Sequence, residues 1–149
     1  MLTLTAVPTT TAVTITTCEP TPAPYQVTDE MFIDAMHKAV ALRGEDYIYP
    51  REHDNNSVRL GYRSLSGACM YRNRLTDEPS CLIGLALSLI DPALCPDASL
   101  VGGASGVIQM NPRTASISDR VAFAADYAQM AQDNGATWGH ALERFVDSI

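Results

Sequence analysis

Residues 79–90 read PSCLIGLALSLI, and this stretch decides the fold. Its apolar residues recur on nearly every side of a helix, so that helix has no polar face to turn towards solvent. Asp77 and Glu78 suit the positive end of a helix, Pro79 suits a first turn, and Asp91 with Pro92 marks the end. We therefore expect a central helix over residues 79–90 that the rest of the chain buries.

A second helix is expected before it, from about Asp29 to Arg43. Thr28 is a suitable N-cap, and Gly44 supplies the stop. One face of this helix is apolar at helical spacing, through Phe32, Ala35, Met36, Ala39 and Val40.

Two further helices are expected near the C-terminus. Ser118 caps the first, Gly135 ends it, and Thr137 caps a short last helix. The first of these helices has two distinct faces. One carries the small residues Val121, Ala124, Ala125 and Ala128, and the other carries Phe123, Tyr127 and Met130. The last helix carries Trp138, Leu142, Phe145 and Val146.

The segments between these helices predict a small antiparallel sheet. Tyr47-Ile48-Tyr49 is strand-like, and residues 57–62 and 68–72 can pair as a hairpin. Residues 93–117 carry several turn formers and are expected to be a loop. The predicted fold is therefore α+β, with about four helices and one small sheet.

Residues 1–27 differ in composition from the remainder, since they hold nine Thr, four Pro and no basic residue. One interpretation is a disordered leader, and the other is an ordered arm that adds to a sheet edge of its own or of a partner. In the second case Val13 and Ile15 would bind the partner, and a homodimer could form by this arm. Residues 28–149 are expected to form a single domain.

Composition excludes several classes of protein. The net charge of −7 disfavours binding to nucleic acid, and no apolar run approaches the length of a membrane span. The first 18 residues have neither a basic start nor a long apolar run, so we expect no secretory signal and a cytoplasmic protein.

The cysteines allow four interpretations. Cys69, Cys81 and Cys95 with His53 can supply four zinc ligands, although no pair shows a short Cys-x-x-Cys spacing. Cys81, near the start of the central helix, can act as a nucleophile with His53 or His140 as its base. Cys69 and Cys81 can instead form a disulfide, or the thiols can simply belong to the core. We expect the last of these, with no cofactor and no metal.

No other motif indicates an enzyme. The glycine-rich stretch 102–106 matches neither phosphate-binding pattern and is expected to be an interaction loop that includes Val107. Trp138 and Phe145 are the other expected partner-binding residues.

Two segments resemble small, uncharacterised proteins of actinobacteriophages and actinobacteria. The first combines Cys69-Met70-Tyr71 with Pro79-Ser80-Cys81-Leu82-Ile83-Gly84, and the second is Gln132-Asp133-Asn134-Gly135-Ala136-Thr137-Trp138-Gly139. The resemblance covers residues 28–146 and implies a phage or actinobacterial protein inside the cell. It implies no activity and no catalytic residue.

The leading functional hypothesis is a small phage-encoded protein that binds a host or self partner without catalysis. The alternatives are a thiol enzyme or redox protein that uses Cys81, a self-associating structural component, and a structural zinc module.

Overall fold

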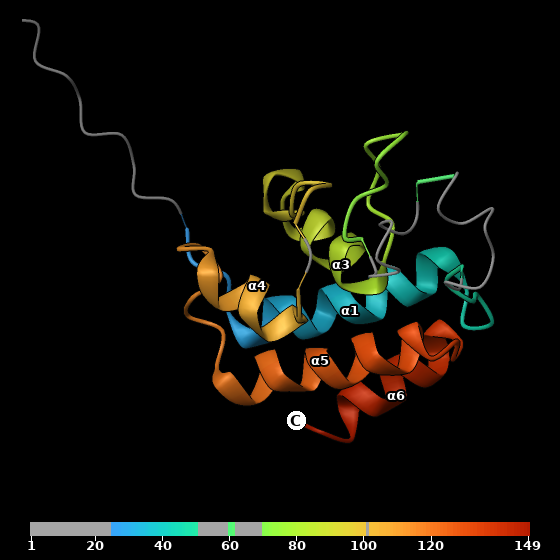
Figure 1. Cartoon of the computed structure of the whole chain (residues 1–149). Helices are drawn as coiled ribbons and strands as arrows, with labels where there is room; N and C mark the ends of the chain where they lie inside the picture. The colour runs from blue at the N-terminus through green and yellow to red at the C-terminus, as the bar shows by residue number, and fades with distance from the viewer. Residues whose placement is uncertain (1–24, 51–59, 62–69, 101) are drawn as a thin grey trace, which may run out of the picture.

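The computed structural model describes residues 25–50, 60–61, 70–100 and 102–149 (Figure 1). Within these ranges the chain forms five α-helices, one short 3-10 helix and no β-strand. The elements are α1 (Asp29–Arg43), α3 (Leu82–Ile90), η1 (Pro92–Leu94), α4 (Ala104–Met110), α5 (Asp119–Asp133) and α6 (Trp138–Val146).

Helix α1 begins and ends where the sequence predicts. The Thr28 side chain accepts a hydrogen bond from the Met31 amide, and Gly44 ends the helix with a positive φ of 102°. All five residues of the predicted apolar face are buried. Local signals therefore suffice to define this helix.

Helix α3 is the expected central helix, shortened at its start. Residues 79–81 are extended, and the Cys81 sulfur caps the helix by accepting from the Gly84 amide at 3.3 Å. Gly84 lies against the Tyr71 carbonyl so closely that any Cβ there would clash with the backbone. A glycine is therefore required at this point for α3 to approach the segment before it.

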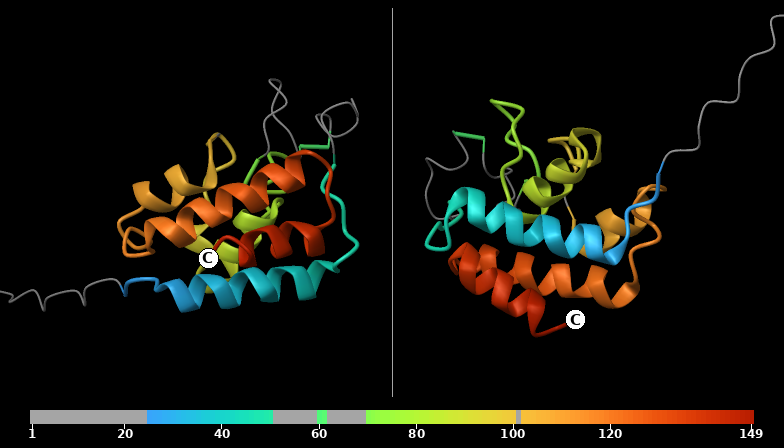
Figure 2. Two further views of the ribbon diagram at one scale, coloured as in Figure 1. Left: turned by 90° about the horizontal axis from the view of Figure 1, so that it is seen from below. Right: turned by 180° about the vertical axis from the view of Figure 1, so that it is seen from behind.

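Helix α6 lies between α1 and α5. Figure 2 shows this arrangement from below, with α6 running back along α5 after the connection at residues 134–137. Ser118 and Thr137 cap α5 and α6 through their side-chain oxygens, as predicted. Phe145 of α6 meets Phe32 of α1 edge to face, with ring centroids 6.1 Å apart.

Helix α4 corrects the prediction of a loop over residues 93–117. Ala104, Val107 and Ile108 share one face of this short helix, and all three are buried in the core. Its first turn has no cap within the helix, but Asp126 of α5 accepts from the Ser105 amide at 2.9 Å. Packing on α5 thus outweighs the weak helix propensity of a stretch that contains glycine and serine.

The predicted α+β class is wrong for the described residues, which form an all-α arrangement. Ile48 makes only an isolated antiparallel bridge to Thr137, and Arg72 makes another to Pro79. The aromatic residues that suggested a strand are used in the core: Tyr49 is buried, and its hydroxyl lies 3.4 Å from the Ser80 hydroxyl. The Tyr47 ring meets Trp138 edge to face at 5.0 Å. Most of the predicted hairpin, residues 57–59 and 62–69, lies outside the described residues.

The loop from Arg72 to Pro79 is held by hydrogen bonds around Asn73. The Asn73 side-chain oxygen accepts from the amides of Leu75 and Thr76, and the backbone amide of Asn73 donates to Glu78. Arg72 donates to the backbone oxygens of Pro92 and Cys95, which ties this loop to η1. The Arg72 side chain is therefore part of the scaffold.

Residues 27–29, near the start of the described chain, are hydrogen-bonded to residues 113–118. The Val27 amide donates to the Arg113 carbonyl, and the Ser116 hydroxyl donates to the Val27 carbonyl. Asp29 accepts from both the amide and the hydroxyl of Ser118 at 2.7 Å. These bonds fix the entry into α1 against the loop before α5.

No helix in the described part of the chain has the length and hydrophobicity needed to cross a membrane.

Candidate functional site

The outer side of α5 carries three large apolar side chains that are exposed and lie in a row. Phe123, Tyr127 and Met130 keep 54%, 48% and 58% of their surface exposed. Their spacing of i, i+4 and i+7 places them in one stripe along the helix. We call these three residues the aromatic face. Single exposed apolar residues are common on protein surfaces, but a row of three on one helix is a candidate contact surface.

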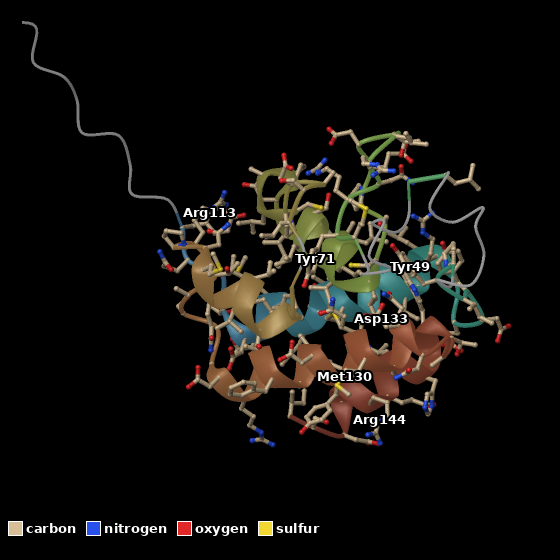
Figure 3. All side chains as sticks on the ribbon, viewed as in Figure 1. Tyr49, Tyr71, Arg113, Met130, Asp133 and Arg144 are labelled. Carbon is tan, nitrogen blue, oxygen red and sulfur yellow. The ribbon has the colours of Figure 1, made fainter. Side chains whose placement is uncertain are left out.

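A groove continues the aromatic face onto α6. Its volume is about 290 Å³, and Tyr127 and Met130 form its wall on α5. His140 and Arg144 line it from α6, one helical turn apart. Figure 3 shows Met130 and Arg144 on the same side of the molecule, at the outer edge of the α5–α6 pair. The contact surface therefore spans two helices and is not flat.

Two exposed arginines border the aromatic face, although the chain as a whole is acidic. Arg120 lies one turn before Phe123 and is exposed, and Arg144 is exposed on α6. Neither guanidinium has an ion-pair partner among the residues that the structure describes. By contrast, Lys38 pairs with Asp34 and Arg113 pairs with Asp91. Two cations thus remain free to meet an acidic group on a partner.

The other edge of α6 borders a second groove with the opposite charge. We call this groove, which lies between α1 and α6 and has a volume of about 480 Å³, the acidic groove. Its apolar lining comes from Val40, Leu142 and Val146. Its polar lining comes from His37 and three carboxylates, Glu45, Glu143 and Asp147.

The thiols are placed as core residues and not as a reactive pair. Cys81 is fully buried and its sulfur is used as the cap of α3. Cys95 is buried as well, and burial raises the pKa of its thiol to about 11. Cys95 is therefore protonated at neutral pH. Both cysteines are free, and the observed burial gives the hypothesis of a thiol enzyme no support.

The zinc hypothesis is likewise without support among the described residues. No group of three or more His, Cys, Asp or Glu side chains there is arranged to hold a metal ion. Two of the four proposed ligands, Cys69 and His53, lie outside the described residues, as does any disulfide that involves Cys69. Both described histidines, His37 and His140, are exposed on α1 and α6, whereas Cys81 and Cys95 are buried.

The predicted partner-binding residues do not form one surface. Val13 and Ile15 lie outside the described residues. Trp138 and Phe145 are fully buried in the core, so neither presents its side chain to a partner in this structure. Val107 is buried on α4, where it lines a cavity of about 370 Å³ beside residues 93–100.

The aromatic face was visible in the sequence, but its significance was not. The spacing of Phe123, Tyr127 and Met130 predicts one helical face, as the structure confirms. Helical spacing alone indicates no binding role for these residues, since a large apolar face on a helix usually enters the core. A clue in the sequence is the alanine-rich face on the same helix. Small side chains let neighbouring helices pack closely against that face, so the face with the large residues is the one left outside.

Comparison with known proteins gives no relative: no family model, no curated protein and no solved structure matches the chain. The resemblance to actinobacteriophage proteins therefore remains a prediction from two sequence segments.

Proposed function

We propose that this protein acts by binding another protein and that the aromatic face with its two arginines is the binding surface. The occupant is a segment that presents apolar side chains flanked by Asp or Glu. The observation that carries the proposal is the exposure of Phe123, Tyr127 and Met130 in one row on a helix whose other side is fully packed.

The charge of the surface selects the kind of partner. Arg120 and Arg144 border the apolar row, and the nearby Glu143 carboxylate is already paired with His140 at 3.3 Å. Guanidinium groups form bidentate hydrogen bonds with carboxylates, which gives both affinity and orientation. Phosphate offers similar chemistry, but the net charge of −7 opposes an approach to nucleic acid.

The shape of the surface favours a helical occupant. An amphipathic helix docks by laying its apolar face into a groove, and the groove between α5 and α6 is lined by Tyr127 and Met130. Large aromatic side chains are also those that contribute most to binding at protein interfaces. We extend the proposal to a cytoplasmic site of action, in line with the two free, buried thiols.

The test is a selection from a displayed library of helical segments against the purified protein. Binders are expected to be enriched in Asp and Glu around apolar positions spaced by three or four residues. The tightest binder is expected to lose at least about tenfold in affinity, or about 1.4 kcal/mol, against Phe123→Asp combined with Tyr127→Asp.

Leu42→Asp is the matched control, because Leu42 is a large exposed apolar residue on α1, outside the groove beside the aromatic face. The control is expected to bind like the wild type. Binders without acidic enrichment, or binders that the aromatic-face variant retains, would overturn the proposal.

A further inference from the structure

The two edges of α6 carry complementary surfaces on the same chain. On one edge, Arg144 stands beside Tyr127 and Met130 of the aromatic face. On the other edge, Asp147 stands beside Leu142 and Val146 in the acidic groove, which Glu45 also lines. The Glu143 carboxylate is paired with His140 at 3.3 Å. One surface is apolar with free cations, and the other is apolar with carboxylates.

We propose that the acidic partner segment is supplied by a second copy of this chain, whose acidic groove receives the aromatic face. This inference rests on the proposed function and names its occupant. The chemistry matches on both counts: Leu142 and Val146 give the apolar contact, while Glu45 and Asp147 meet Arg120 and Arg144. Val146 is 40% exposed, so it presents apolar surface that the contact would cover.

The positions of the two surfaces suit a symmetric dimer. Helix α6 lines both grooves, so the two surfaces are neighbours across this one helix. A two-fold axis beside α6 places each aromatic face opposite the partner's acidic groove, so both contacts form at once. Such a self-complementary contact is the usual form of a homodimer and closes without free ends.

Because both copies carry a net negative charge, the attraction between them must come from groups in direct contact. Two copies with a charge of −7 each repel one another at long range. At physiological salt this repulsion is screened beyond about 8 Å, whereas charges in direct contact are screened less. The matched surfaces beside α6 are therefore able to hold together two chains that repel one another as whole molecules.

A charge exchange tests the inference. The first variant combines Arg120→Glu with Arg144→Glu and makes both surfaces acidic. The second combines Glu45→Arg with Asp147→Arg and makes both surfaces basic. Each variant alone is expected to be a monomer of about 16.1 kDa by analytical ultracentrifugation, whereas the wild type is a dimer of twice that mass.

The decisive sample is an equimolar mixture of the two variants. Mixing restores opposite charges at both contacts, so a heterodimer is expected to form. Arg74→Glu combined with Lys38→Glu is the control, since it changes the net charge as much as the first variant but leaves both surfaces intact. This control is expected to remain a dimer, and circular dichroism verifies that every variant is folded.

Three results would overturn the inference: a wild type that stays monomeric at about 100 µM, where even a weak dimer forms; a control that dissociates; or a mixture that remains monomeric. A monomeric wild type would leave the proposed function standing if selected acidic segments still require the aromatic face. Failure of both experiments would remove both proposals.

Discussion

The two sides of α5 reverse the usual arrangement of a surface helix. The inner side is made of small and polar residues, Val121, Ala122, Ala124, Ala125, Ala128, Gln129 and Gln132, and all of them are buried. The outer side carries the larger apolar residues of the aromatic face. An ordinary amphipathic helix places its largest apolar residues inside, where each buried side chain contributes about 1.5–3 kcal/mol.

The difference between these sides separates two functions within one helix. Alanines inside allow α4 and α6 to approach α5 closely, and the two glutamines bond to neighbouring segments: Gln132 accepts from the Leu82 amide at 2.8 Å. The large residues outside keep 48–58% of their surface exposed, which leaves apolar surface for an external contact.

The largest effect should come from adding bulk to the inner side. Ala128→Leu places three more carbons in a filled core, and overpacking of this kind costs about 3 kcal/mol. Urea denaturation followed by circular dichroism measures the change. Met130→Leu on the outer side is the control and is expected to be neutral. Equal stability of the two variants would show that the inner side is loosely packed.

A smaller loss is expected when the inner hydrogen bond is removed. Gln132→Leu keeps the volume but leaves the Leu82 amide at the start of α3 without its partner, which costs about 2 kcal/mol. Arg120→Leu, an exposed substitution on the outer side of the same helix, provides the comparison by thermal denaturation and should change little. A destabilisation as large for Arg120→Leu would contradict the contrast between the two sides.

Deprotonation of the buried Cys95 thiol should also destabilise the fold. Since burial raises the pKa of this thiol from 9.0 to about 11, the folded state holds the proton more tightly than the unfolded state does. The associated stability is complete below pH 9 and is lost as the pH rises towards 11. The loss amounts to about 1 kcal/mol once solvent screening is allowed for. Cys95→Ala should be less sensitive than the wild type over this range; parallel pH curves would refute the assignment.

The smallest effect on stability is expected at the aromatic face itself. Phe123→Ala should change the free energy of unfolding by no more than about 0.5 kcal/mol, as for other exposed positions. Differential scanning calorimetry on dilute protein measures this value without a contribution from association. A loss of stability comparable to that of Ala128→Leu would mean that Phe123 belongs to the scaffold. The outer side of α5 would then not be available as a binding surface.

The helices were predictable because their signals are local. Thr28, Ser118 and Thr137 each mark a helix start by a side chain that bonds to a nearby amide, and the structure places all three as caps. The sheet prediction failed because Tyr47 and Tyr49 have strand propensity, while their tertiary contacts with Trp138 and Ser80 decide their place. Helix α4 was missed for the converse reason, as it depends on Asp126, a residue distant in sequence.

The candidate site was only half predictable. The row of Phe123, Tyr127 and Met130 follows from helical spacing, but whether a face lies inside or outside depends on which neighbours cover it. The role of Arg144 could not be anticipated at all, because it is set by the way α6 folds back along α5. Trp138 and Phe145 show the same limit, since residues typical of interfaces are equally typical of cores.

The hydrogen bonds that Val27 and Asp29 make with residues 113–118 also have a mechanical consequence. A force applied to the chain at Tyr25 does not pull first on the turns of α1. It is borne by the bonds from Val27 to Arg113 and Ser116 and from Asp29 to Ser118, which link it to the loop before α5. A load on the preceding residues is thereby passed to the helix that carries the aromatic face, and α1 unwinds only after these bonds have broken.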